Sequence, residues 1–376
     1  MTFGVLALIT AAGLGGPALA FGRRGVVPVV VGELAAGVLI GKTGTGWLDP
    51  NDPTTAFLGN VGFAMLMFGA GLHVPIRQPG IERGLRRGVV AALATGVLAV
   101  PLGLVIHDLV GGRTAIYALL VASGSAAIVL PILEEQHLLD DPRALTLMAQ
   151  VGIADVAAIV ALPLVLQPHK AVHAALGGLA VAAAAVGVFL VTTRLRGRAL
   201  VDQWRQESKQ RTWALDLRLS LVVLFALAWL AQRTGTSILI AGFAVGLLVA
   251  IVGGPKRLST QVTGVGAGFF VPLFFVVLGA RLDLRAVFQH TNTLELAALL
   301  VTATVAAHLV SALVTRQPPA AGLAATAQLG LPAGVATLGL QEHILSPGRA
   351  AAIVLAALAT IAITPVGVAL LSRRRA

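Results

Sequence analysis

The sequence predicts an all-α membrane protein that crosses a bilayer about thirteen times. Hydrophobic residues make up 57% of the 376 residues and charged residues only 11%, and the mean hydropathy is +0.90. Soluble domains carry roughly a quarter of their residues as charged side chains, so this balance excludes an ordinary soluble fold. Apolar runs of about 20 residues recur along the chain, and this is the length that a helix needs to span the hydrocarbon.

Charged residues, Gly or Pro bound each of the thirteen predicted helices. An Ala-Leu-Ala sequence that ends the first run is similar to a signal cleavage site, but no basic segment precedes that run. We therefore interpret it as a membrane helix and not as a removed leader. The predicted helices are residues 3–20, 25–41, 54–73, 88–109, 113–133, 145–166, 171–193, 214–232, 236–252, 260–280, 295–315, 320–341 and 349–371.

Basic residues are distributed unequally between the two sides that these helices define. Twenty of the 27 Lys and Arg residues fall in one set of loops and helix ends and seven in the other. The richer side is normally cytoplasmic, so we expect a protein of the cytoplasmic membrane with its N-terminus outside and its C-terminus inside. The net charge of +11 then reflects contact with the lipid bilayer, and no nucleic-acid partner is expected, because no soluble basic module is present.

A polar stretch divides the chain into comparable halves. Residues 194–213 are predicted to be a cytoplasmic linker between residues 1–193, with helices one to seven, and residues 214–376, with helices eight to thirteen. Each of helices one to six then corresponds to a helix seven crossings later. Because seven is odd, the two repeats have opposite orientations, as in many secondary transporters. No soluble regulatory domain is expected, because the last helix ends close to Ala376.

Helices five and twelve correspond in this arrangement, and both carry small, polar or helix-breaking residues in mid-span. Gly lowers the cost of unwinding and Pro removes a backbone donor, so freed carbonyls and helix ends at two crossing broken helices can line an ion site. Either segment alone also fits close packing and kinking. The residues are Ser123, Gly124, Ser125 and Pro131 in helix five, and Thr326, Gln328, Gly330, Pro332 and Gly334 in helix twelve.

Asp155 lies at the centre of helix six, within the apolar residues 145–166. An ionisable group at this depth costs a few kcal/mol on the most lenient scale, about 2.5 or more. Such groups usually face water-filled cavities in which ions or protons move. Asp155 is therefore the first candidate for an ion-binding or proton-binding residue.

Five segments in order along the chain resemble the membrane domain of the cation:proton antiporter superfamily, on the branch of bacterial sodium/proton antiporters and Kef-type potassium efflux proteins. Each segment alone is a weak apolar pattern, but their order and spacing are specific. The segments are GELAAGVLIG at Gly32–Gly41, LGNVGFAMLMFGAGLHV at Leu58–Val74, SGSAAIVLPILEEQHLL at Ser123–Leu139, GTSILIAGFAVGLLVA at Gly235–Ala250 and FFVPLFFVVLGARLDL at Phe269–Leu284.

The resemblance places Asp155, in AQVGIADVAAI, at the position of the family's essential cation- and proton-binding aspartate. It also implies a homodimer. Relatives often carry Asp, Asn or Gln before this aspartate, whereas this chain has Ala154, and one carboxylate favours electroneutral exchange. The chain also departs in helix twelve, where Leu331 and Pro332 replace the acidic residue of Kef-like relatives.

His308 stands in helix eleven where relatives commonly place a Lys or Arg that pairs with the core aspartate. Two interpretations are open. The imidazole can hydrogen-bond a neighbouring carbonyl, or it can replace the cationic partner and act as a pH switch, since the ordinary pKa of histidine is about 6.5. Glu33, in the middle of helix two, is the other acid at membrane depth, and its expected role is structural because the resemblance assigns that helix to the scaffold half.

These expectations lead to a secondary-active antiporter, with Na⁺ preferred and Li⁺ or K⁺ as alternatives, that works by alternating access without a cofactor. Burial favours a protonated carboxyl and a bare cation favours the ionised form, so proton and monovalent metal ion compete for Asp155. Ser125 and nearby carbonyls are the expected cation ligands, and Gln328 is a polar neighbour from the other repeat. Ser123, Gln150 and Thr326 are secondary candidates.

The sequence fits other classes of protein less well. An intramembrane aspartyl protease needs two carboxylates that share a proton, and a zinc hydrolase needs more histidines than one at membrane depth and a motif such as HExxH, so an enzyme is not expected. A K⁺/proton antiporter or gated K⁺ efflux channel of Kef type stays open, as does a non-transporting membrane sensor or scaffold.

Overall fold

The computed structural model describes residues 2–21, 29–74, 81–139, 141–166, 168, 171–195, 199–211, 213–234, 236–253, 256–282, 285 and 291–373. The regular elements of these residues are helices. Those of the first half are α1 (Phe3–Gly13), α2 (Gly15–Ala20), α3 (Val29–Ile40), α4 (Pro53–Leu72), α5 (Ile81–Val110), α6 (Thr114–Ala122), α7 (Ala126–Glu135), α8 (Pro142–Leu166) and α9 (Ala171–Leu195).

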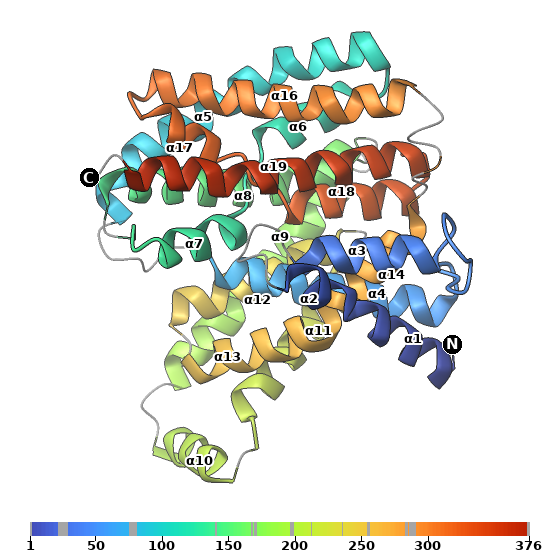
Figure 1. Cartoon of the computed structure of the whole chain (residues 1–376). Helices are drawn as coiled ribbons and strands as arrows, with labels where there is room; N and C mark the ends of the chain where they lie inside the picture. Colours follow the sequence, from blue (N-terminus) through green and yellow to red (C-terminus); the bar gives the residue numbers. More distant parts are fainter. Residues whose placement is uncertain are drawn as a thin grey trace.

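The second half continues the same pattern after the polar stretch. Its elements are α10 (Ala199–Gln210), α11 (Leu215–Arg233), α12 (Ile238–Val252), α13 (Lys256–Val265), the π-helical turn η2 (Gly266–Phe270), α14 (Val271–Arg281), α16 (Thr291–Val314), α17 (Pro319–Ala324), α18 (Gly330–Gln341) and α19 (Pro347–Arg373). The axes of most of these helices are roughly aligned, and the N-terminus and the C-terminus lie at opposite ends of the molecule (Figure 1).

The predicted all-helical membrane fold is confirmed. Nine helices of the described residues are long and apolar enough to cross a membrane, and the shorter apolar helices include α3 and α12. Several predicted single helices are composite, since α1 with α2, α6 with α7, α13 with η2 and α14, and α17 with α18 each fill one predicted crossing. The predicted linker contains the short helix α10, which lies at the bottom of the molecule in Figure 1.

Helix ends follow ordinary capping chemistry. Asp52 caps α4, because its carboxylate accepts the backbone N–H of Thr55 at 2.9 Å and Pro53 occupies the first turn. This hydrogen bond, together with that from the Thr55 hydroxyl, lowers the pKa of Asp52 from its usual value. Ser237 caps α12 in the same way, and Gly253 ends it with a left-handed φ of 69°.

Helix contacts divide the molecule into two units. The core unit consists of α5–α8 and α16–α19, and the scaffold unit of α1–α4, α9, α11–α14 and η2. Contacts between the units involve α8 with α9 and α12, and α4 with α7 and α18. The pairs also obey the inverted repeat, since α5 packs on α8 as α16 packs on α19, and α3 packs on α14 as α12 packs on α4.

Glycine permits the closest of the scaffold contacts. A Cβ atom added to Gly37 of α3 would overlap the carbonyl oxygen of Val276 in α14, and one added to Gly246 of α12 would overlap that of Phe68 in α4. These two glycines therefore allow direct backbone contact at equivalent positions of the two repeats.

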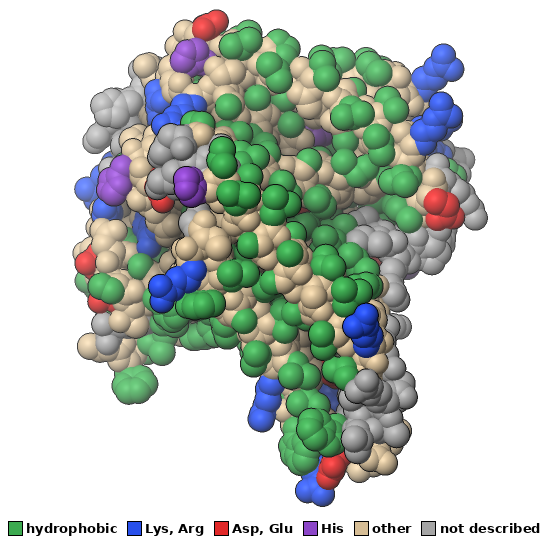
Figure 2. Space-filling view, turned by 180° about the vertical axis from the view of Figure 1, so that it is seen from behind, with side chains coloured by type: hydrophobic (Ala, Val, Ile, Leu, Met, Phe, Trp, Pro, Cys, Tyr) green, Lys and Arg blue, Asp and Glu red, His purple; other side chains and the backbone are tan. Residues whose placement is uncertain are grey.

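The surface matches a bilayer environment. Hydrophobic side chains cover most of the middle of the face in Figure 2, and Lys and Arg side chains lie mainly near its margins and on its lower part. Large apolar residues such as Val97, Leu179 and Val222 are exposed. In water such a surface would be costly, whereas lipid tails solvate it.

Candidate ion site

Two interrupted helices meet in the core unit. The first interruption is Ser123–Ser125, between α6 and α7, and the second is residues 325–329, between α17 and α18. In Figure 1, α7 and α17 lie toward the end of the molecule that carries the C-terminus and α18 toward the other end, as inverted repeats require. The interruptions precede the prolines, because Pro131 lies within α7 and Pro332 within the first turn of α18.

Gln328 joins the two interruptions. Its amide nitrogen donates to the carbonyl oxygen of Leu120, at the end of α6, at 2.6 Å, and to the hydroxyl of Thr304 in α16 at 3.4 Å. The Ser123 hydroxyl donates to the same Leu120 carbonyl at 2.8 Å. The backbone N–H of Ser123 donates to this carbonyl oxygen as well, at 3.2 Å, so three donors converge on the end of the broken helix. The side chains of Ser123 and Gln328 are buried.

Asp155 meets the other side of the first interruption. Its carboxylate accepts the backbone N–H of Ala126, the first residue of α7, at 3.3 Å. The start of a helix leaves N–H groups unpaired and carries partial positive charge, which stabilises an anion. The Asp155 residue is only 2% exposed, so loss of hydration opposes this stabilisation of the charged form.

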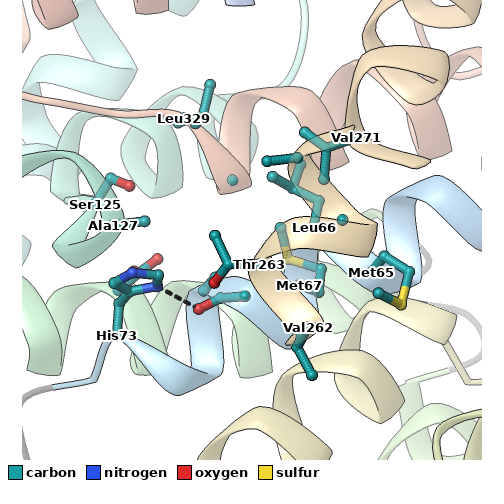
Figure 3. A pocket seen from close by; sticks show the side chains of 16 residues that line it. Met65, Leu66, Met67, His73, Ser125, Ala127, Val262, Thr263, Val271 and Leu329 are labelled. Carbon is teal, nitrogen blue, oxygen red and sulfur yellow. Dashed lines mark hydrogen bonds between the residues drawn. The ribbon is translucent and has the colours of Figure 1, made fainter. Parts of the chain in front are cut away.

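A cavity of about 140 Å³ reaches Asp155 between the two units. The core unit contributes Asp155, Ser125 and Ala127, and the scaffold unit contributes residues of α4, α13 and η2. Figure 3 shows Ser125, His73 and Thr263 around this cavity, with apolar side chains such as Met67 and Leu329 completing its wall. Among the described residues that line this cavity, Asp155 carries the one carboxylate, and Ser125 and Thr263 carry hydroxyl oxygens.

A broken-helix crossing beside a buried aspartate is consistent with the family that the sequence resembles. The family model described as "Sodium/hydrogen exchanger, transmembrane" matches residues 5–374. The chain belongs to this family. It is thus a multi-pass membrane protein of a family of cation:proton antiporters.

Relatives of this exchanger-family chain support the same assignment. A Bacillus subtilis protein named for Na(+)/H(+) antiport, YjbQ, is 24% identical over 371 residues that cover 90% of this chain and 58% of the relative. The Na(+)/H(+)-K(+) antiporter GerN of Bacillus cereus is 24% identical over 267 residues, which cover 68% of this chain and 65% of GerN. The chain therefore spans less than two thirds of the length of either protein.

The fold is similar to that of a solved antiporter. The sodium proton antiporter MjNhaP1 from Methanocaldococcus jannaschii matches with a TM-score of 0.64 and 16% sequence identity, over 99% of this chain and 96% of that structure. At this identity the match bears on the fold alone, and it confirms the predicted sodium/proton antiporter architecture.

His308 of this exchanger-family chain is buried in α16 and directed toward its own helix. Its ring Nδ1 lies 2.9 Å from the carbonyl oxygen of Thr304, one turn earlier. No ion pair links His308 to Asp155 among the described side chains. The Thr304 hydroxyl accepts a hydrogen bond from the Gln328 amide. His308 is therefore connected to the crossing of the broken helices through Thr304, a residue of its own helix.

The secondary candidates are distributed around the crossing. Gln150, also in α8, donates to the Thr95 hydroxyl of α5 at 3.5 Å, and Thr326 donates to the carbonyl oxygen of Leu323 at 2.8 Å. Both side chains are buried, and the Thr326 hydroxyl also lies 3.5 Å from the carbonyl oxygen of Thr360 in α19. Neither lines the cavity that reaches Asp155.

Glu33 lies outside the crossing. It is 4% exposed in α3 of the scaffold unit and faces a separate cavity of about 230 Å³, bounded by α1, α2, η2 and α14. The two acids at membrane depth therefore occupy different cavities, and they do not form a carboxylate pair.

The cavity includes two polar residues that the sequence analysis did not select. His73 ends α4, and Thr263 lies in α13. His73 falls within the Leu58–Val74 segment that resembles the family's third helix, at the last position of the predicted helix 54–73. A histidine at the end of a membrane helix, in a segment with family resemblance, is the signal that would have identified it.

Proposed function

We propose that this chain exchanges a monovalent cation for a proton across the cytoplasmic membrane, with Na⁺ as the preferred cation. The observation that carries the proposal is the position of Asp155, which is buried beside the N-terminus of the broken helix α7 and at the end of a cavity. Ser125, in the same interruption, and neighbouring carbonyl groups supply further oxygen ligands for the cation. Hard monovalent cations bind such oxygen ligands.

Competition for one carboxylate couples the two fluxes. Without bulk water, an uncompensated carboxylate is unfavourable, and either a proton or a metal cation removes that cost. Asp155 is the only acidic residue among the described residues that line the cavity, and the preceding position holds Ala154. One proton exchanged for one monovalent cation moves no net charge, so we propose electroneutral exchange.

The division into two units supports alternating access. Asp155 and Ser125 belong to the core unit, whereas the opposite wall of the cavity belongs to the scaffold unit. Movement of the core unit against the scaffold would close this cavity and open one on the other side. The basic-residue asymmetry supports an orientation with the N-terminus outside and the cavity, near the C-terminal end of α4, open to the cytoplasm.

K⁺ is the second candidate cation. The support comes from GerN, whose name includes both Na(+) and K(+). The cavity is lined by few polar groups, and Na⁺, Li⁺ and K⁺ all take oxygen ligands, so direct comparison of the three cations decides between them. We further propose that the chain functions as a homodimer, as the family resemblance implies.

Reconstituted transport tests the proposal. Purified protein in liposomes with an internal pH dye is given Na⁺, Li⁺ or K⁺ outside, over a series of pH values. We expect Na⁺-driven proton movement that is insensitive to an imposed membrane potential. Asp155→Asn should abolish it, because the amide cannot exchange a proton for a cation, whereas Glu33→Gln, which changes the buried acid of the scaffold unit, should retain it.

Three outcomes would contradict the proposal. Full exchange by Asp155→Asn would show that Asp155 is not the site shared by the proton and the cation. Cation flux that follows the membrane potential without proton movement would indicate a channel. Absence of flux together with absence of cation binding in the folded wild-type protein would indicate a sensor or scaffold.

A further inference from the structure

The cavity that reaches Asp155 contains a second titratable side chain. Of the described residues that line it, Asp155 and His73 are the two with ionisable side chains. Asp155 comes from α8 of the core unit and His73 from the C-terminal end of α4 in the scaffold unit. A cation that enters from the α4 end therefore encounters an imidazole on one unit and a carboxylate on the other.

Hydrogen bonding fixes the form of the neutral imidazole. The Nδ1 atom of His73 lies 2.6 Å from the carbonyl oxygen of Gly69, the contact drawn as a dashed line in Figure 3. A carbonyl oxygen only accepts, so Nδ1 carries the hydrogen and, in the neutral ring, Nε2 is a bare acceptor. The ring stands beside the cavity, across from Ser125 and next to Thr263 (Figure 3).

The other charged side chains that the structure describes on the elements around α4 lie outside this cavity. The elements packed against α4 are α7, α11, α12, α13, η2, α14 and α18. None of their described charged side chains lines the cavity. These side chains are Glu134 of α7, Asp216, Arg218 and Arg233 of α11, Arg257 of α13 and Arg281 of α14. His73 is thus the one ionisable side chain, besides Asp155, among the described residues that line this cavity.

We propose that His73 is a cation-access residue. In the neutral state, the lone pair of its free imidazole nitrogen binds the cation as the ion loses water on the way to Asp155. In the protonated state, the imidazolium repels the cation. The proposal rests on exchange at Asp155 and adds a second residue that determines how well the cation competes. It concerns the apparent affinity for the cation and not the chemistry at the carboxylate.

The consequence is a pH effect that acts from one face. Acidification on the side of the cavity should raise the KM for the cation more steeply than competition at Asp155 alone, because the imidazolium adds repulsion to proton binding. The maximal rate should change little, since His73 belongs to α4 of the scaffold unit and not to either of the broken helices.

Two variants separate the role of the His73 nitrogen as an acceptor from the role of the charge on the ring. His73→Gln keeps a polar acceptor but cannot titrate, so it should retain the wild-type KM at alkaline pH and show a smaller rise in KM at acidic pH. His73→Ala should raise the KM several-fold at alkaline pH, because the acceptor is lost. His173→Gln, at an exposed histidine of α9, is the matched control and should behave as wild type throughout.

The measurements combine transport with cation binding. Na⁺-dependent proton movement is recorded in vesicles that expose the cavity face, and Na⁺-induced thermal stabilisation is recorded for the same variants in detergent. A wild-type KM at every pH in both His73 variants, with normal folding, would overturn the inference. Asp155→Asn tests the proposed function separately, since loss of exchange in that variant combined with unchanged His73 variants would refute only the role of His73.

Discussion

At the scale of residues, the site depends on a few buried polar groups that belong to different segments. Asp155 stabilises the start of α7, and Gln328 and Ser123 satisfy the end of α6. Buried polar groups without partners cost about 1–3 kcal/mol each, so these hydrogen bonds hold both broken ends in a defined place. His308 reaches the same network through Thr304.

Replacement of His308 tests the predicted pH switch. We expect His308→Ala to flatten the pH dependence of the maximal exchange rate without loss of exchange, because the Gln328–Thr304 hydrogen bond does not need the imidazole. Thr302→Ala, at an exposed site on the same helix, is the control. The rate is measured in liposomes at saturating Na⁺ across the pH series, and an unchanged pH profile would contradict the switch.

At the scale of elements, small residues decide which helices can approach each other. The scaffold unit has direct backbone contact where α3 meets α14 and where α12 meets α4, and both contacts need glycine. Such packing replaces the hydrophobic effect, which does not operate between helices in lipid. Small and polar residues also mark the breaks between α6 and α7 and between α17 and α18. These breaks occur at residues 123–125 and 325–329 and not at the prolines.

Substitution of Gly37 tests the close contact in the scaffold. Gly37→Ala places a methyl group against the backbone of Val276, and such overpacking costs about 1–3 kcal/mol. We expect a lower unfolding temperature in detergent. Gly187→Ala in α9 meets nothing within 4 Å, so it should be neutral or slightly stabilising. Equal unfolding temperatures for the two variants would show that the contact between α3 and α14 accommodates a methyl group at residue 37 without cost.

At the scale of the whole molecule, transport requires that the core unit move against the scaffold unit. Asn60 of α4 and Gln341 of α18 are joined by a hydrogen bond of 3.2 Å across the boundary between the units. The chain contains no cysteine, so introduced thiols will react selectively. This boundary is where movement can be stopped.

A cross-link across the boundary tests this movement. We expect Asn60→Cys combined with Gln341→Cys, joined by a short bifunctional thiol reagent, to stop exchange. The same pair joined by a reducible reagent should recover exchange on reduction. Val110→Cys with Arg349→Cys, near an Arg349–Val110 hydrogen bond of 2.8 Å within the core unit, is the control. Full exchange by the linked boundary pair would contradict alternating access.

The membrane class, the predicted crossings and the correspondence between the repeats could all be predicted from the order of residues alone. Hydropathy, charge and helix length are local properties of the chain, and a bilayer of fixed thickness converts them directly into helices. Asp155 could also be selected from sequence, because a lone acid in an apolar run has a cost that needs a function. The breaks were predicted in the correct helices, since Gly and polar residues mark them.

Which groups meet could be seen only after the helices were placed in space. Gln328 contacts a carbonyl 208 positions away in the chain, and His73 shares a cavity with Asp155 although the two residues belong to different units. The direction of His308 toward Thr304 likewise depends on how α16 packs. Such relations arise from packing between distant helices, and a local pattern of residue types carries no record of which faces of two helices are turned toward each other.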